Sequence, residues 1–564
     1  MSQLITEHLA IWTTAPKGIK KLRELILELA VRGLLVPQDA NDEPASELLT
    51  KIAAEKARLV SEGKIKPPKP LANISEEEKP FGLPMGWEWV RLGDYCDVRD
   101  GTHDSPKAQL SGYPLITSKN LYSGKLDFTH VNFISEEEHL KIIERSRVDR
   151  NDILFAMIGS IGNPVIVNTD IEFSIKNVAL FKQFSDNLSV PEFLKIYLEL
   201  ATVAMKEQSS GGVQPFVSLG KLRAYLMPLP PLAEQQRIVA KVDELMQLCD
   251  QLEQKQNGSE VMHRQLVNCL LSTLTEASDA QAFQAAWSRI AANFDCLFTT
   301  EHSIEQLKQT ILQLAVMGKL VPQNPNDEPA SELLNKIATE KARLITEGKI
   351  RKQNPLPKIS AQEKPFALPN GWEWVRLQNI LDVRDGTHDS PKSATGENTY
   401  PLVTSKDFDK GIIKFDSAKR ISAQDHDEIS KRSYVEQFDI LFSMIGGNIG
   451  NQVMVKEDNP FSIKNVALFK YYNKELTPPF YIKKITEHLA LDLQTKAAGG
   501  AQPFVGLGFL RNIVIALPPV NEQHRIVTKV DELLTLCEQL KTKLATAKTL
   551  QQQLAETLVQ QAVA

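Results

Sequence analysis

The chain has 564 residues, of which 42% are hydrophobic and 24% charged, with a net charge of −5 and a pI near 6.1. Its length predicts about four folding units, and its ordinary composition excludes bulk disorder. No run approaches the ~18 apolar residues that a membrane span needs. The first residues lack a signal-peptide pattern and the five cysteines lack zinc or redox spacing, so we expect a cytoplasmic protein without disulfides.

The sequence contains a long internal repeat. Residues 33–107 and 318–392 align without a gap, and about 54 of the 75 positions are identical. The offset between the copies is 285 residues here and grows to 288 downstream, because two residues are added after Lys392 and one beside Met444. A period of this length predicts the duplication of a domain. Two interpretations remain open: two similar domains in series, or an internal copy of a symmetric dimer that faces a target with two related halves.

Each copy begins with helical segments. In the first copy, apolar spacing predicts a helix over residues 18–31, and Asp42-Glu43-Pro44 predicts the start of a second helix that stops at Gly63. Residues 64–84, rich in proline and lysine, are expected to form a linker or extended arm. From residue 86 to residue 230, short apolar runs alternate with turn residues, which predicts a mixed α/β or mainly β domain.

A long amphipathic helix is predicted after each mixed domain, following Pro230-Pro231 and Pro518-Pro519, because apolar residues recur there at heptad spacing. We expect Asn257-Gly258 to interrupt the first helix. The spaced positions are Ile238, Val242, Leu245, Cys249, Leu252, Met262, Leu266, Cys269, Leu270 and Leu274, and then Ile526, Val530, Leu533, Cys537, Leu540, Leu544, Ala547, Leu554 and Leu558. Neither helix can bury such a stripe alone, so we expect the two to pair as an antiparallel coiled coil. Packing against another protein, instead of or in addition to this pairing, is the alternative.

No catalytic constellation is found in the sequence. Residues 477–481, Thr-Pro-Pro-Phe-Tyr, come near the Asn/Asp-Pro-Pro-aromatic element of adenine methyltransferases. Threonine stands where that chemistry needs an amide or carboxylate, so we interpret the segment as a helix start. Residues 157–163 contain glycines and are interpreted as a strand-turn-strand loop, and no P-loop is present. Because the lone histidines and scattered acids form no metal site or nucleophile, we expect a non-catalytic chain.

Two motifs close each copy. Gly-Gly-x-Gln-Pro-Phe-Val-x-Leu-Gly-x-Leu occupies residues 211–222 and 499–510, and Leu-Pro-Pro-x-x-Glu-Gln-x-Arg-Ile-Val follows at 229–239 and 517–527. With these paired motifs, each leading into a long helix, the chain resembles the specificity subunit of type I restriction–modification systems over essentially its whole length.

The resemblance implies a division of labour between subunits. This chain would read a bipartite site in double-stranded DNA and would itself hold no cofactor. Two methyltransferase (M) subunits would bind S-adenosylmethionine and modify an adenine in each half-site, and a motor and nuclease (R) subunit would use ATP and Mg to cleave unmodified DNA. A self-sufficient adenine methyltransferase with a fused recognition domain, or a coiled-coil adaptor without DNA affinity, remains an alternative.

The resemblance also implies an α/β (α+β) fold. Two target-recognition domains would stand in a pseudo-two-fold arrangement, separated by long antiparallel coiled-coil helices, with extra helical segments before each domain. The expected boundaries are residues 1–80 for an N-terminal helical region and linker, 81–230 for target-recognition domain 1, 231–275 for a central helix, 276–364 for a second helical region and linker, 365–518 for target-recognition domain 2 and 519–564 for a C-terminal helix.

The long helix has a length suited to a ruler between two half-sites. Glu234 to Gln256 spans roughly 35 Å at ~1.5 Å per residue, which is about one turn of B-DNA. We expect one helical turn inserted near Leu252, matched on the partner helix, to lengthen the spacer that is recognised. An unchanged spacer in methylation maps would discard this idea.

Charge gives no direct sign of DNA binding. Residues 86–230 sum to about −3 and residues 371–518 to about zero. Since phosphate binding relies on Lys and Arg, these residues must cluster on one face, or partner subunits must supply much of the DNA clamp. We therefore expect the isolated chain to bind DNA weakly.

Base readout needs polar donors and acceptors on exposed loops, and four segments in each copy qualify. In the first copy the candidates are Thr102, His103 and Lys107; Thr117, Ser118, Lys119 and Asn120; Ser160 and Asn163; and Lys176, Asn177 and Gln214. In the second copy they are Thr387, His388 and Lys392; Thr404, Ser405 and Lys406; Asn448 and Asn451; and Lys464, Asn465 and Gln502. The alternatives are structural: tight turns at Gly101 and Gly386, a cap by His103, a snorkelling Lys176 and a packed Gln214.

The copies agree at many of these candidates, so we expect half-sites that are related but not identical. Discrimination between them should lie where the copies differ, at residues 108–112, at residues 120–151 and in the loop after Met157. Contacts with the M subunits are expected at the starts of the long helices, with ordinary helix capping as the alternative. The residues concerned are Glu234, Gln235 and Arg237, and Glu522, Gln523 and Arg525.

Overall fold

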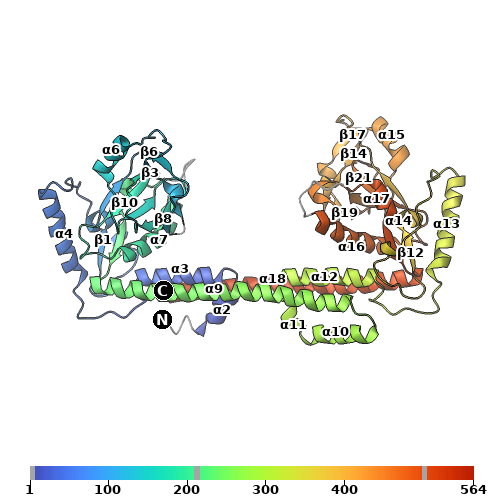
Figure 1. Cartoon of the computed structure of the whole chain (residues 1–564), viewed down its shortest axis with the longest axis horizontal. Coiled ribbons are helices and arrows are strands. Elements are labelled where there is room, and N and C mark those ends of the chain that lie inside the picture. The colour runs from blue at the N-terminus through green and yellow to red at the C-terminus, as the bar shows by residue number, and fades with distance from the viewer. Residues whose placement is uncertain (1–6, 123, 209–215, 498–504, 564) are drawn as a thin grey trace. The chain divides into compact units, whose positions relative to one another are not determined.

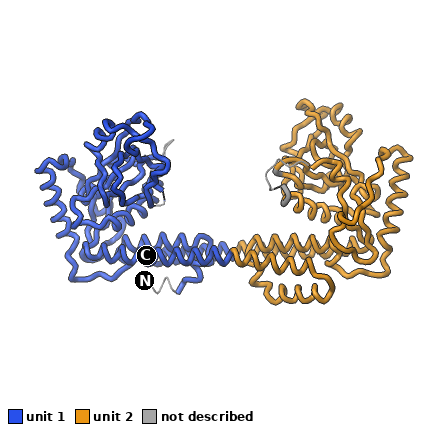
Figure 2. The backbone as a smooth tube through the Cα atoms, viewed as in Figure 1, with its two compact units in different colours: residues 1–260, 547–564 blue, residues 261–546 orange. Residues whose placement is uncertain are grey.

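The computed structural model describes residues 7–122, 124–208, 216–497 and 505–563. These residues form two compact units (Figure 2). Unit 1 contains Met1–Glu260 and Ala547–Ala564, and unit 2 contains Val261–Thr546. Each unit holds one mixed domain, called domain 1 (residues 86–230) and domain 2 (residues 371–518) below.

The helical part of unit 1 consists of α2 (Leu9–Thr14), α3 (Gly18–Val31), α4 (Ala45–Ser61) and the 3₁₀ turn η1 (Glu76–Glu78). Helix α3 has the bounds that apolar spacing predicts, and its Leu22 and Leu29 are fully buried. Glycine is needed at position 18, the first residue of α3, because a Cβ atom there would lie 2.3 Å from the backbone oxygen of Trp12. Helix α4 ends just before Gly63, whose φ of +71° suits a residue without a side chain.

The described part of domain 1 forms three sheets and a hairpin. Strands β1 (Glu88–Arg91) and β11 (Leu226–Leu229) pair antiparallel and join the start of the domain to its end. A four-stranded sheet has the order β2 (Asp97–Asp100), β10 (Val178–Lys182), β7 (Ile153–Ala156) and β8 (Gly162–Ile166). A three-stranded sheet has the order β6 (Asn132–Ile134), β3 (Tyr113–Ile116) and β9 (Ser174–Ile175), and β4 (Leu121–Tyr122) pairs with β5 (Lys125–Leu126). The helical elements are α5 (Leu92–Tyr95), η2 (Ser118–Asn120), α6 (Glu136–Ser146), α7 (Pro191–Gln208) and α8 (Leu219–Ala224).

The four-stranded sheet of domain 1 is buried on both faces, which explains its unbroken apolar runs. Phe155 and Phe181 on one face join the core that includes residues of α7. Leu154 and Leu180 on the other face join a second core with Ile116. Alternation of side chains along each strand produces this division. The antiparallel pair β7 and β8 flanks residues 157–161, so the predicted strand-turn-strand loop is confirmed.

Domain 2 repeats the plan strand by strand. Strand β12 (Glu373–Arg376) pairs with β22 (Val514–Leu517), and the four-stranded order is β13 (Leu381–Asp385), β21 (Val466–Tyr471), β18 (Ile440–Ser443) and β19 (Gln452–Met454). The three-stranded order is β17 (Lys419–Ser422), β14 (Thr399–Val403) and β20 (Ser462–Ile463), and β15 (Phe408–Asp409) pairs with β16 (Ile412–Ile413). Its helical elements are α14 (Leu377–Ile380), η4 (Ser405–Asp407), η5 (Phe415–Ser417), α15 (Ala423–Ser433), η6 (Gly446–Asn448), α16 (Pro479–Ala497) and α17 (Leu507–Asn512). Helix α16 confirms the interpretation of residues 477–481 as a helix start.

Unit 2 also has helices outside domain 2, namely α10 (Ala280–Ala292), α11 (Phe294–Leu297), α12 (Glu301–Val316), α13 (Ala330–Thr346) and the 3₁₀ turn η3 (Ala361–Glu363). Helices α12 and α13 repeat α3 and α4, whereas α10 and α11 lie in the sequence between the end of α9 and α12. Ile290 of α10 is fully buried in the main core of unit 2.

The two long helices, α9 (Leu232–Thr275) and α18 (Val520–Val563), each contribute to both units (Figure 1). In unit 1, Val242 and Cys249 from the first part of α9 share a core with Leu558 from the last part of α18. In unit 2, Leu271 from the end of α9 shares a core with Ile526 from the start of α18. The start of one helix thus packs with the end of the other, as an antiparallel coiled coil requires. Among the described helices, none is both long and apolar enough to cross a membrane.

The predicted interruption of α9 at Asn257-Gly258 is wrong, because the helix continues through both residues. The predicted continuation of the apolar stripe is also partly wrong. Met262 and Leu266 are 66% and 52% exposed, while Val267, together with Leu271 and Leu274, is buried. A straight helix has 3.6 residues per turn, so the buried face drifts relative to a strict heptad frame.

Candidate nucleic-acid interface

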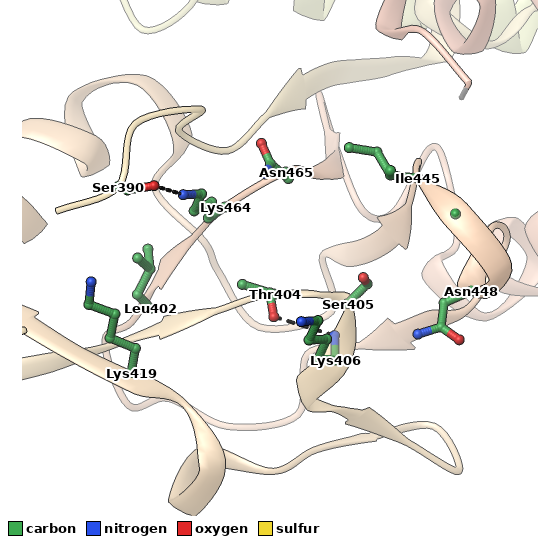
Figure 3. Close-up of a pocket in the computed structure, with 11 residues that line it drawn as sticks. Ser390, Leu402, Thr404, Ser405, Lys406, Lys419, Ile445, Asn448, Lys464 and Asn465 are labelled. Carbon is green, nitrogen blue, oxygen red and sulfur yellow. Dashed lines mark hydrogen bonds between the residues drawn. The ribbon is translucent and has the colours of Figure 1, made fainter. Parts of the chain in front are cut away.

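Parts of the predicted contact segments of the second copy meet in a depression of domain 2 with a volume of about 550 Å³ (Figure 3). It is called the polar depression below, after the lysine, serine, threonine and asparagine residues in its lining. Among the residues that the structure describes, eleven line it: Ser390, Leu402, Thr404, Ser405, Lys406, Lys419, Ile445, Gly446, Asn448, Lys464 and Asn465. Six of them are candidates named from the sequence. The structure adds Ser390 and Lys419 as polar lining residues. Three lysines therefore share one surface: Lys406 of η4, Lys419 of β17 and Lys464, which follows β20.

A capped turn presents Ser405 and Lys406 at this depression. Thr404 follows β14, and its backbone N–H and Oγ1 both donate to Asp407 Oδ2, at 2.8 Å and 2.9 Å. Asp407 is buried, and the two hydrogen bonds that it accepts hold the turn in place. Lys406 remains exposed, while Ser405 is half-buried.

Hydrogen bonds to Ser390 and His388 orient Lys464 and Asn465, which directly follow β20. The Lys464 ammonium donates to Ser390 Oγ. His388 Nδ1 lies 3.0 Å from Asn465 Oδ1, and His388 Nε2 lies 2.9 Å from Asp385 Oδ2. This contact occupies the carboxamide oxygen of Asn465 and leaves its NH₂ group to donate elsewhere.

Domain 1 repeats this support. His103 Nδ1 lies 2.9 Å from Asn177 Oδ1, and His103 Nε2 lies 3.0 Å from Asp100 Oδ2. The Lys176 ammonium donates to Ser105 Oγ at 2.5 Å. Because both ring nitrogens face oxygen acceptors, the hydrogen bonds to Asn177 and then to Asp100 raise the pKa of His103 above its ordinary value.

One predicted base contact, Asn120, is wrong. Its side chain is 4% exposed and holds its own loop together. Asn120 Oδ1 accepts from the N–H and the hydroxyl of Thr117 at 3.0 Å and 2.9 Å, and its Nδ2 donates to the carbonyls of Asp127 and His130, both at 3.1 Å. A side chain used in this way cannot also reach a base edge.

The predicted partner contacts at the helix starts are wrong for the four residues Glu234, Gln235, Glu522 and Gln523, which are at most 1% exposed. The indole N–H of Trp87 donates to Glu234 Oε2 at 3.0 Å, and that of Trp372 donates to Glu522 Oε2 at 3.1 Å. Burial raises the pKa of both carboxyl groups. These residues instead join each long helix to its mixed domain.

The two arginines of that prediction are half-buried and ion-paired within the chain. Arg237 pairs with Asp42 at 2.5 Å, and Arg525 pairs with Asp327 at 2.6 Å. Their contact with a partner stays a prediction.

The other candidates lie on or near the same loops. Lys107, Ser160, Asn163 and Lys392 are exposed, and Asn451 is half-buried. Thr102 and Thr387 form parallel bridges to Lys176 and Lys464. Ser118 and Lys119 occupy the turn η2, which matches η4. Gln214 and Gln502 lie outside the described residues.

Lys419 was missed because its strand pairing is invisible in the sequence. It begins β17, opposite Leu402 in β14, and this pairing brings it to the depression. Lysine and hydroxyl donors in such a group can bind phosphate oxygens or the acceptor edge of a base. Among the described residues, no cluster of three His, Cys, Asp or Glu is suited to a metal ion.

Comparison with known proteins assigns the chain to a class. The family model for the type I restriction modification DNA specificity domain matches residues 84–260 and 369–548. The chain is 39% identical to the specificity subunit of the type I restriction enzyme EcoAI and 36% identical to that of EcoEI. Both relatives are from Escherichia coli, and in each comparison 100% of this chain and 100% of the relative are covered. A crystal structure of the HsdS subunit from Thermoanaerobacter tengcongensis matches with a TM-score of 0.41 and 20% identity, covering 86% of this chain and 98% of that one.

The family model and the two Escherichia coli relatives define a DNA-specificity protein of the restriction–modification class. The chain belongs to the family of type I restriction–modification specificity subunits, and as such it is a non-catalytic subunit. The resemblance drawn from the paired motifs is confirmed.

Proposed function

We propose that this chain selects the DNA sequence on which a type I restriction–modification complex acts, with each mixed domain reading one half of a bipartite site. The polar depression carries the proposal, because donors from five sequence segments converge there. Two of its lysines also answer the charge problem, since domain 2 has about zero net charge but places Lys406 and Lys464 on one surface. Phosphate binding needs such local clustering rather than a basic chain.

The proposal includes assembly with two M subunits, which would bind S-adenosylmethionine and methylate an adenine in each half-site. An R subunit would use ATP and Mg to cleave unmodified DNA. The long helices offer apolar surface for such partners: Met262 and Leu266 of α9 and Leu550 and Leu554 of α18 are all exposed. Exposed apolar side chains on helices are typical of interaction surfaces.

Adenine-methylation sequencing tests the proposal in cells that carry the chain and its M subunits. We expect a bipartite methylated motif that disappears when the chain is removed. Replacing Lys406 and Lys464 with alanine should reduce methylation and weaken DNA binding in gel shifts with the M subunits. Lys431→Ala is the control, because Lys431 pairs with Glu428 on α15 and does not line the depression. Unchanged methylation in the double variant would contradict the assignment of the depression.

A further inference from the structure

Nearly all residues that line the polar depression of domain 2 recur at the equivalent positions of domain 1. Strand registers fix the equivalence, since Leu402 faces Lys419 in domain 2 and Leu115 faces Asn132 in domain 1. Nine lining positions are identical: Ser390 and Ser105, Leu402 and Leu115, Thr404 and Thr117, Ser405 and Ser118, Lys406 and Lys119, Ile445 and Ile158, Gly446 and Gly159, Lys464 and Lys176, and Asn465 and Asn177. Two positions differ.

The first difference is a loop of changed length. Four residues separate Gly446 from Asn451, whereas three separate Gly159 from Asn163. Asn448 of this loop lines the depression. Because the loop lengths differ, the two loops cannot place equivalent side chains at equivalent points.

The second difference is a substitution in a fixed frame. Lys419 and Asn132 each begin the edge strand of their three-stranded sheet, and both are exposed. Figure 3 shows Lys419 extending past Leu402 toward the end of the depression where Lys464 meets Ser390. The Lys419 ammonium donates to the carbonyl of Pro391, which confirms that it reaches that end.

The neighbouring difference, Arg420 against Phe133, does not act at the depression. Arg420 Nε donates to Thr399 Oγ1 at 2.6 Å, so the guanidinium is held against its own sheet. Lys419 and Asn132 are therefore the lining pair in which chemistry changes while the backbone stays fixed.

We propose that Lys419 and Asn132 set different base preferences at the same position of the two half-sites, an inference that rests on the proposed function. A lysine ammonium only donates, so it suits the O6 and N7 acceptors of guanine in the major groove. An asparagine carboxamide both donates and accepts, so it suits the N6 and N7 edge of adenine. Domain 2 should therefore prefer guanine where domain 1 prefers adenine.

Reciprocal substitution tests this in the complex with the M subunits. Lys419→Asn should shift the preference at one position of the second half-site from guanine to adenine by about tenfold in methylation ratio, and leave the first half-site unchanged. Asn132→Lys should do the reverse in the first half-site. Lys419→Arg should keep the guanine preference, because the guanidinium also donates to O6 and N7. Lys431→Asn is the matched control and should change neither.

The outcomes separate three cases. A loss of methylation that is equal for all sequences, with a shallower salt dependence of DNA binding, would show that Lys419 contacts phosphate and would overturn the inference. Unchanged preference at every position in both reciprocal variants, with unfolding midpoints equal to the parent chain, would also overturn it. If the parent complex methylates no site that depends on this chain, the proposed function fails instead.

Discussion

The two mixed domains make the same contact where they attach to the long helices, and they differ at two lining positions of the polar depression. Trp87 with Glu234 in domain 1 and Trp372 with Glu522 in domain 2 make the same indole–carboxylate hydrogen bond, at 3.0 Å and 3.1 Å. At the depression, by contrast, a lysine replaces an asparagine and a loop gains one residue. The comparison teaches that the two copies share the attachment to the long helices and differ in a few side chains exposed at the depression.

The largest expected effect comes from removing the indole that each domain packs against its long helix. Trp87→Ala should lower the free energy of unfolding by about 3–5 kcal/mol, because it opens a cavity in the core of unit 1 and removes the donor to the buried Glu234 carboxylate. Trp372→Ala should lower the free energy of unfolding of unit 2 by a similar amount. Denaturant titration followed by circular dichroism measures both. A loss below about 1 kcal/mol in only one of the two variants would show that the two tryptophan contacts are not equivalent.

A smaller effect should follow from exchanging a loop residue between the copies. Asn120 of domain 1 corresponds to Asp407 of domain 2, and His130 corresponds to Ser417. Asn120 Nδ2 donates to two carbonyls, whereas Asp407 Oδ1 accepts from the Ser417 hydroxyl at 3.0 Å. Asn120→Asp should therefore destabilise domain 1 by about 1–3 kcal/mol, since it turns a donor into a carboxylate facing carbonyl oxygens.

The double variant Asn120→Asp with His130→Ser sharpens this comparison. The new serine can donate to the carboxylate as Ser417 does, so part of the lost stability should return. Thermal unfolding of the parent, both single variants and the double variant forms a double-mutant cycle. Additive losses would show that the paired change at these positions is not compensatory.

Much of the secondary structure could be predicted from the sequence, because it depends on local patterns. Residues 18–31 show helical spacing and form α3, and residues 477–481 begin α16. Asn120 could not be assigned correctly, because burial of a polar loop residue depends on the distant backbone that folds over it. The same holds for Lys419, since only the pairing of β14 with β17 brings it to the depression.

The helix starts show a different limit of the sequence. Glu234 and Gln235 have the polar character of exposed residues, and nothing nearby in the chain indicates that Trp87, far away in sequence, covers Glu234. The informative signal was the repeat itself. Glu-Gln recurs at 522–523 and Trp recurs at 372, and the second copy makes the same contact between them.

The histidine support gives a prediction for pH. The folded-state pKa of His103 is raised above its ordinary value of 6.5 by the hydrogen bonds to Asn177 and Asp100. A raised histidine pKa gives stability that is fully present below the unfolded pKa and is lost as pH rises through the folded pKa. His103→Gln should therefore lower the stability of domain 1 more at pH 5.5, about one unit below the ordinary histidine pKa, than at pH 8, above it.

Thermal unfolding at both pH values measures this difference between the His103→Gln variant and the parent. An equal loss at the two pH values would show that the histidine acts only by packing. His388→Gln probes the same geometry in domain 2, where the ring lies between Asn465 and Asp385.

The smallest expected effect compares the two long helices. Gly258 of α9 corresponds to Thr546 of α18, and a Cβ atom at Gly258 would meet nothing within 4 Å. Because glycine in a helix interior is about 0.5–1 kcal/mol less favourable than alanine, Gly258→Ala should stabilise the chain by about that amount. Denaturant titration measures the gain, with Thr546→Gly as the opposite change on α18, expected to destabilise the chain by a few tenths of a kcal/mol. A loss of stability in Gly258→Ala would mean that α9 needs a flexible point there, as the Asn-Gly pair first suggests, and that the two helices are not equivalent rods.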